Sequence, residues 1–146
     1  MKSVQQIVAV LKEKGYKITP QRLAIFEALE GNTSHPSAEQ LFIALRKKHP
    51  TISFTTVYNT LQTLKDLGEI RELAIDPERR RYDPDLSSHH HAICSECGAI
   101  FDVYANFSHG LTLPEELKNS FIVKDFEINF YGRCTNCSSS ETSHEV

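Results

Sequence analysis

The 146-residue sequence has no long hydrophobic run, no large excess of one charge and only four cysteines. Its apolar runs, such as Ile7–Leu11, are far shorter than the ~20 residues that a membrane-spanning helix needs. The N-terminus has no apolar stretch ending in a small-residue cleavage site, so we expect no signal peptide and a cytoplasmic location. With 40% hydrophobic and 24% charged residues, the composition is typical of a soluble globular protein of one domain or two small ones.

The net charge of −3 argues only weakly against nucleic-acid binding, because the charge is unevenly distributed. Residues 1–83 carry a net charge of +3 and residues 84–146 carry −6. A mildly basic N-terminal part and an acidic C-terminal part indicate two lobes with different partners. We therefore predict two lobes, over 1–83 and 84–137, and a disordered tail over 138–146, which lacks apolar anchors.

Hydrophobic periodicity predicts helices in the first half and strands after it. The expected helices lie within Ser3–Lys14, from Thr19-Pro20 to Gly31, behind Ser37, and from Ser53 or Thr55 to Leu67. Ile70–Ile75 and Arg80–Tyr82 then have the composition of two short strands joined by a turn at Asp76–Arg79. This order is that of a winged helix-turn-helix domain, in which the helix before the hairpin enters the major groove.

The fourth predicted helix presents a polar face of Thr, Tyr, Asn and Gln side chains that can bond to base edges or phosphates. Arg79, Arg80 and Arg81 lie at the hairpin tip or flank, where arginines can contact phosphates. The alternative interpretation is a small helical packing module with a solvated charged turn. The predicted DNA-binding residues are Arg22, Thr55, Thr56, Tyr58, Asn59, Arg79 and Arg80.

In the second half, Pro114–Asn119 favours a short helix and Phe121–Tyr131, rich in aromatic and β-branched residues, favours a strand. The overall prediction is an α+β fold: an N-terminal winged helix-turn-helix domain and a small C-terminal unit of helix and sheet. The sheet of this C-terminal unit could pair with that of a second copy in a dimer.

Four cysteines form two C-x-x-C pairs, Cys94/Cys97 and Cys134/Cys137. In a chain without an export signal this spacing favours thiolate metal ligands over disulfides. Two such pairs that converge would make a tetrahedral zinc cage with no open coordination position, and the zinc would be structural. A redox dithiol switch and a disulfide pair are the alternatives.

A second group of candidate metal ligands lies on either side of the first cysteine pair in the sequence. Strand geometry would place His89 and His91 on one face and His90 on the other, and Asp102 follows shortly after. Asp83 and His35 are further candidates if the fold brings them close. A nitrogen and oxygen site with up to five ligands favours Fe²⁺ or Mn²⁺ over tetrahedral zinc.

Taken together, these motifs resemble the ferric uptake regulator family of metal-dependent bacterial repressors. The segments that carry the resemblance span residues 10–137 and include Ile18–Arg22, His35–Ala38, Thr56–Leu61, His89–Cys94, Cys97-Gly98 and the closing C-x-x-C. The resemblance implies a homodimer that binds inverted-repeat operator DNA, with a winged-helix DNA-binding domain over 1–83 and a metal-binding dimerisation domain over 84–137. It implies that Tyr58 touches bases and that Arg22 contacts DNA. It also implies structural Zn²⁺ held by Cys94, Cys97, Cys134 and Cys137, and regulatory Fe²⁺ or Mn²⁺ held by His35, Asp83, His89, His91 and Asp102.

Within the family, Asp102 and Asp83 resemble the peroxide-sensing branch, whereas the iron-sensing branch generally has glutamate at the position of Asp102. In the peroxide branch, iron and hydrogen peroxide oxidise a histidine ligand, and His35 and His89 match the oxidised positions. The resemblance therefore implies a repressor that releases DNA after peroxide oxidation.

Three other functions remain open at this stage. One is an iron- or manganese-responsive repressor of metal uptake with the same ligands and no oxidation step. A metalloenzyme would need an open metal position and a general base, and no further His or Glu at a suitable spacing is present, so we expect no enzyme. The third is a zinc-stabilised protein-interaction module that does not bind DNA.

Overall fold

The structure, a computed structural model, describes residues 1–139. These residues form two compact units, one from Met1 to Leu86 and one that begins at Ser87, slightly later than the boundary predicted after Asp83. Both units combine helices with a small sheet, which confirms the α+β class. Within the described part of the chain, no helix is long and apolar enough to cross a membrane.

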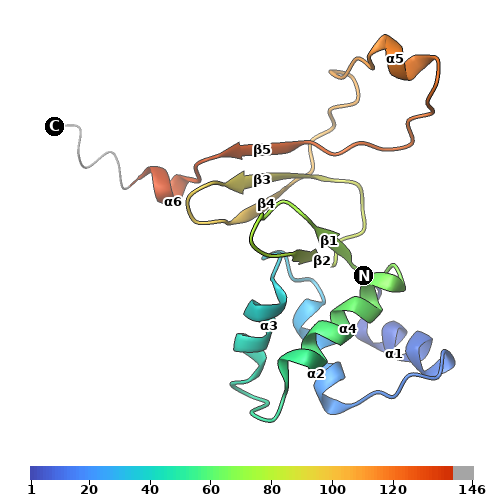
Figure 1. Ribbon diagram of the computed structural model, residues 1–146, viewed down its shortest axis with the longest axis vertical. Coiled ribbons are helices and arrows are strands. Elements are labelled where there is room, and N and C mark those ends of the chain that lie inside the picture. Colours follow the sequence, from blue (N-terminus) through green and yellow to red (C-terminus); the bar gives the residue numbers. More distant parts are fainter. Residues whose placement is uncertain (140–146) are drawn as a thin grey trace. The chain divides into compact units, whose positions relative to one another are not determined.

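The first unit begins with four helices: α1 (Val4–Glu13), α2 (Pro20–Leu29), α3 (Ala38–Leu45) and α4 (Phe54–Asp66) (Figure 1). Each helix starts where a hydroxyl side chain accepts a hydrogen bond from a first-turn N–H group, at Ser3, Thr19, Ser37 and Ser53. Such caps satisfy backbone donors that have no partner inside the helix. The four predicted helices are thus confirmed.

After α4 the chain forms an antiparallel hairpin of β1 (Arg71–Leu73) and β2 (Arg81–Asp83). The core of the unit lies among the helices and includes the fully buried Phe26, Leu61 and Leu64. Burying each such side chain contributes about 1.5–3 kcal/mol. The helices and hairpin therefore have a core of their own within this unit.

The second unit is built on a three-stranded sheet with β3 (His90–Cys94) in the centre, as Figure 1 shows. β4 (Ile100–Val103) pairs with it antiparallel, and β5 (Asn129–Gly132) pairs with it parallel. The long connection between β4 and β5 contains the short helix α5 (Glu115–Lys118), and α6 (Thr135–Ser138) follows β5. The sheet thus joins the first cysteine pair to the second.

The strand predicted over Phe121–Tyr131 is wrong for its first part, since residues 121–128 form no strand. Pairing with β3 ends where the carbonyl of Ile128 accepts from the N–H of His91 at 3.1 Å. The N–H of Ile128 donates instead to Nδ1 of His90 at 3.0 Å, so a side chain takes the donor group that a longer strand would use. Of the tail predicted over 138–146, Ser138 belongs to α6, and residues 140–146 lie outside the described part.

Candidate metal centres

The four cysteines converge at one end of the sheet of the second unit. Cys94 ends β3, Cys97 lies in the turn after it, and Cys134 and Cys137 lie at the start and within α6. The Sγ atoms of Cys94 and Cys137 are 3.8 Å apart, as are those of Cys97 and Cys134, and all four lie within 4.8 Å of one another. A tetrahedron with Zn–S bonds of ~2.3 Å has edges of about 3.8 Å, so the four sulfurs match the size of a zinc cage.

The backbone around these sulfurs is arranged to stabilise negative charge. The N–H groups of Cys97 and Cys134 lower the pKa of the Cys94 thiol to about 6, and Cys134 N donates to Cys94 Sγ at 3.3 Å. The neighbouring Cys134 sulfur, by contrast, raises the pKa of the Cys137 thiol. Four thiolates at this spacing need a cation among them, which is what a divalent metal supplies. None of the four cysteines forms a disulfide, and the 3.8 Å between Cys94 and Cys137 and between Cys97 and Cys134 is far longer than an S–S bond.

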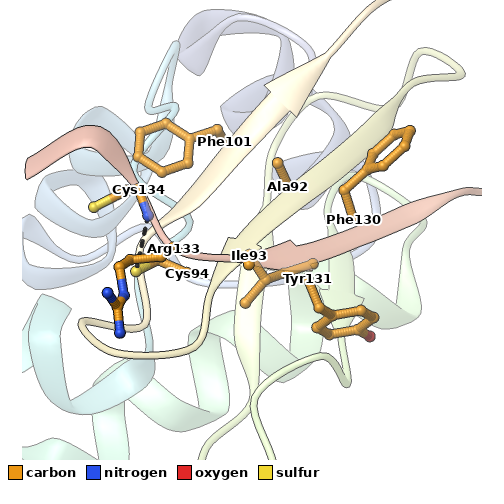
Figure 2. A pocket seen from close by; sticks show the side chains of 9 residues that line it. Ala92, Ile93, Cys94, Phe101, Phe130, Tyr131, Arg133 and Cys134 are labelled. Atoms are coloured by element: carbon orange, nitrogen blue, oxygen red, sulfur yellow. Dashed lines mark hydrogen bonds between the residues drawn. The ribbon is translucent and has the colours of Figure 1, made fainter. Parts of the chain in front are cut away.

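A small pocket of about 160 Å³ lies on the sheet beside the cysteines (Figure 2). Figure 2 shows Cys94 and Cys134 at one end of it, joined by the hydrogen bond described above, and Phe130 at the other end. Phe101, Phe130 and Tyr131 are 47%, 45% and 66% exposed, which is high for large apolar side chains. The surface of this sheet is thus more apolar than a solvent-facing sheet requires.

The β3–β4 pair brings two histidines onto one carboxylate. His91 pairs with Asp102 across the two strands, and His89 comes just before β3, on the same face as strand alternation predicts. Nε2 of His89 lies 3.0 Å and Nε2 of His91 lies 3.5 Å from Oδ1 of Asp102. Both imidazoles are buried and the Asp102 side chain is 10% exposed. Three ligand groups therefore converge away from bulk water.

The other nitrogen of each ring determines what this convergence can bind. Nδ1 of His89 lies 2.7 Å from the carbonyl of Ser87, and Nδ1 of His91 lies 2.8 Å from Oε1 of Glu127. A carbonyl or ionised carboxylate oxygen only accepts, so each Nδ1 is the donor. In the neutral ring Nε2 then carries a lone pair that faces the Asp102 carboxylate. Lone pairs at these distances repel unless a cation or a proton lies among them, so the donor set fits a divalent metal.

In the first unit, His35 and Asp83 form a second ligand pair. Ser37 pairs with Arg81 in an isolated bridge and the N–H of Tyr82 donates to the carbonyl of Pro36 at 3.0 Å, which brings the loop before α3 to the end of β2. His35 Nε2 lies 3.5 Å from Asp83 Oδ2, and both side chains are buried. His35 has φ +52°, a left-handed conformation that is rare for a non-glycine residue and costs about 1–3 kcal/mol.

The prediction that Arg81 is available for phosphate contact, like Arg79 and Arg80, is wrong. Arg81 is 7% exposed, and its guanidinium donates to the carbonyl of His35 and to that of Ser34 at 3.4 Å. Arg81 therefore stabilises the strained backbone that carries His35. His90, predicted to point away from the ligands, is buried between Phe107 and Phe126 and is a structural residue.

The predicted DNA-contacting residues lie mostly on exposed positions of the first unit. Tyr58 is 46% exposed on α4, where Thr55 and Asn59 are also exposed, whereas Thr56 is half-buried and bonds to Ser53. Arg79 and Arg80 are exposed in the hairpin, and Arg80 forms an ion pair with Glu72. Arg22, at the start of α2, donates to the carbonyl of Lys17 at 2.6 Å.

Two contacts of the candidate histidine ligands were not predicted from the sequence. Glu127 bonds to His91 from 36 residues away, and Tyr104 stacks on His89 with ring centroids 5.1 Å apart. Neither residue belongs to a ligand motif, so spacing gives no signal for them. Tyr104 lies close enough to Asp102 in sequence that strand alternation would have placed both on one face.

Comparison with known proteins gives consistent matches. The model of the ferric uptake regulator family matches residues 13–131. The peroxide operon regulator of Bacillus subtilis is 38% identical over 141 residues, covering 94% of this chain and 95% of its own length. The iron-bound ferric uptake regulator of Francisella tularensis has a TM-score of 0.73 at 28% identity, covering 85% and 96% of the two chains. PerR from Streptococcus pyogenes, described in terms of peroxide sensing and gene regulation, has a TM-score of 0.54 at 29% identity, covering 94% of each chain.

Proposed function

Because this chain belongs to the ferric uptake regulator family, we propose that it is a metal-dependent DNA-binding repressor that hydrogen peroxide inactivates by oxidation of a histidine ligand. The observation that carries the proposal is the convergence of two buried imidazoles on the Asp102 carboxylate. Imidazole and carboxylate ligands suit Fe²⁺ and Mn²⁺. The Bacillus subtilis and Streptococcus pyogenes relatives named for peroxide regulation support the peroxide-sensing branch.

The four helices and the hairpin of the first unit would act as a winged helix-turn-helix, with α4 as the helix in the major groove. The exposed Tyr58 and Asn59 support this role, since their polar atoms can reach base edges or phosphates. Arg79 and Arg80 on the hairpin would contact phosphates. Arg22, Thr55 and Thr56 complete the proposed DNA-binding set.

A homodimer is proposed as the DNA-binding form. The exposed Phe101 and Phe130 support it, because they lie on one face of the sheet of the second unit, where contact with a second copy would remove both from water. Two copies would present two α4 helices to an inverted repeat.

The test of this part is a mobility-shift titration of the metal-loaded protein on an inverted-repeat duplex. We expect a salt-dependent shift that Tyr58→Ala and Arg22→Ala weaken while thermal stability stays near the wild-type value. A shift of Tyr58→Ala equal to that of the wild type would exclude Tyr58 of α4 from the DNA contact, and the same result for Arg22→Ala would exclude the contact from α2.

We assign the cysteine cage to structural Zn²⁺ held by Cys94, Cys97, Cys134 and Cys137, because its sulfur spacing and lack of an open position suit that ion. The regulatory Fe²⁺ or Mn²⁺ is assigned to His35 and Asp83 of the first unit together with His89, His91 and Asp102 of the second. Neither group is a full coordination shell by itself. One ion held by both groups would couple occupancy of this site to presentation of α4.

When bound, iron would supply the electron that splits hydrogen peroxide and so deliver an oxidant next to its own ligands. His35 and His89 are the proposed targets. The ring would lose two electrons to the peroxide overall, with one peroxide oxygen added to the ring and the other leaving as water, and the oxidised ring would be a poorer ligand. The remaining ligands would then hold the ion less tightly, and the operator would be released. Asp102 would supply the negative charge that a divalent cation held between two neutral imidazoles requires.

The test is peptide mass spectrometry on protein loaded anaerobically with Fe²⁺ and then exposed to low hydrogen peroxide. We expect one added oxygen atom on the His35 or His89 peptide with iron, none with Mn²⁺, and none with iron in Asp102→Ala. Absence of oxidation in the iron-loaded wild type would reject peroxide sensing. The protein would then be an iron- or manganese-responsive repressor, the alternative that the same ligands support.

A further inference from the structure

His91 has a carboxylate partner on Nδ1, the ring nitrogen that faces away from Asp102. Nδ1 of His91 lies 2.8 Å from Oε1 of Glu127, on the segment that leads into β5. The His91 ring is fully buried, and the Glu127 side chain is 37% exposed. The parallel pairing of His91 with Asn129 brings this segment alongside the ring.

The partners of the two histidines differ in kind. His89 donates to the neutral carbonyl of Ser87, whereas His91 donates to a carboxylate. A hydrogen bond to an ionised acceptor is roughly twice as strong as one between neutral groups. It also raises the electron density on the opposite ring nitrogen, which makes that nitrogen a stronger ligand.

We propose that Glu127 is a positioning residue for the regulatory metal: its carboxylate holds the proton on Nδ1 of His91 and so keeps the Nε2 lone pair directed at the metal position beside Asp102. This inference rests on the proposed function, because it concerns the same regulatory ion. Without Glu127 the imidazole is free to carry its proton on Nε2, and metal binding must then first move that proton.

The conservative variant separates this role from simple packing. Glu127→Gln retains an oxygen that accepts from Nδ1, so the tautomer is kept and only the negative charge is lost. Glu127→Ala removes the acceptor altogether. Asp125→Asn is the matched control, because it removes a carboxylate from the same segment while keeping the oxygen that accepts from Ser88 and from the Phe126 N–H.

The first measurement is the protonation pattern of the His91 ring in zinc-loaded full-length protein without regulatory metal, read from long-range ¹H–¹⁵N correlation spectra. We expect the proton on Nδ1 in the wild type, in Glu127→Gln and in Asp125→Asn, and a gain of the Nε2-protonated form in Glu127→Ala. A proton on Nε2 in the wild type overturns the inference, whatever the protein binds.

The second measurement is Mn²⁺ affinity by calorimetry on the same four proteins. Glu127→Ala should weaken binding by about 10–100-fold, Glu127→Gln by less, and Asp125→Asn should match the wild type. Zinc content should stay constant throughout. If Mn²⁺ binds the wild type and Glu127→Ala with equal affinity, the role of Glu127 is refuted and the proposed function is unaffected. If the wild type binds no Mn²⁺, the proposed function fails and this role fails with it.

Discussion

Replacing Cys97 by serine should unfold the second unit while the first unit stays folded. Cys97 is exposed and contributes little to packing, so its loss acts through the metal. Binding of a structural zinc ion is coupled to folding, and its free energy is then part of the folding free energy. The perturbation therefore tests whether the cysteine cage replaces a hydrophobic core in this unit.

The magnitude follows from how little the second unit buries. Among its described residues, Cys94 and Ile100 are the only apolar side chains that are buried, whereas the first unit buries fifteen. Burial of two side chains contributes about 3–6 kcal/mol, and zinc binding by four cysteines contributes roughly 10–16 kcal/mol. Loss of the ion therefore removes the greater of these two stabilising free energies, and no comparable apolar burial remains within the unit itself.

Hydrogen exchange read by mass spectrometry, with zinc content measured in parallel, checks this prediction. Amides of β3 and β5 should lose protection in Cys97→Ser and keep it in Asn136→Ala, which alters α6 between Cys134 and Cys137 without removing a thiolate. Amides of α2 and α4 should stay protected in both variants. If β3 and β5 remain protected after zinc is lost, the reasoning from burial is wrong.

Three further predictions concern the first unit. Leu61→Ala, which empties a fully buried core position, should lower the free energy of unfolding by about 2–5 kcal/mol in chemical denaturation, and a loss below about 1 kcal/mol would contradict the core described above. Arg79→Ala should reduce the slope of log affinity for operator DNA against log salt by about 1.8, since each copy of the proposed dimer would lose one phosphate contact, and an unchanged slope would remove this residue from the phosphate contacts. Burial raises the pKa of Glu72, but hydrogen bonds from Lys65 and Arg80 outweigh it and hold the pKa below the ordinary 4.5. The free energy of unfolding of the wild type should therefore exceed that of Glu72→Gln by about 1 kcal/mol above pH 4.5. This difference should vanish as pH falls through the pKa of Glu72 in the folded protein. A difference in unfolding free energy that is independent of pH would refute its origin in the ion pairs.

The helices and the grouping of ligands by face were predictable because their causes are local. Hydroxyl caps and proline set helix starts, as Thr19 and Ser53 do here. Strand alternation separates His89 and His91 from His90, and their ring contacts follow that pattern. These features depend on residues a few positions apart, so the sequence contains the information directly.

Features that depend on distant partners were missed or misassigned. Arg81 directly follows two exposed arginines in the sequence, so its neighbours give no sign that it is buried. Its burial depends on the bridge to Ser37, which is distant in the sequence. The strand predicted from Phe121 has suitable composition, but β3 offers it a partner only from Asn129 onward. Glu127 gave no signal, because a hydrogen bond to His91 depends on the register of the strand that follows it.

The parallel pairing of β3 with β5 sets an order of events during translation. The first unit contains its whole core within residues that leave the ribosome early, so it can fold while synthesis continues. β3 is made soon afterwards, but one of its two edges has no strand to pair with until β5 has been made, and the last two cysteines follow β5. A nascent chain thus acquires α4, the proposed DNA-binding helix, before it can complete either proposed metal site. Any chain interrupted before Cys134 would carry that helix without the zinc cage that is proposed to stabilise the rest.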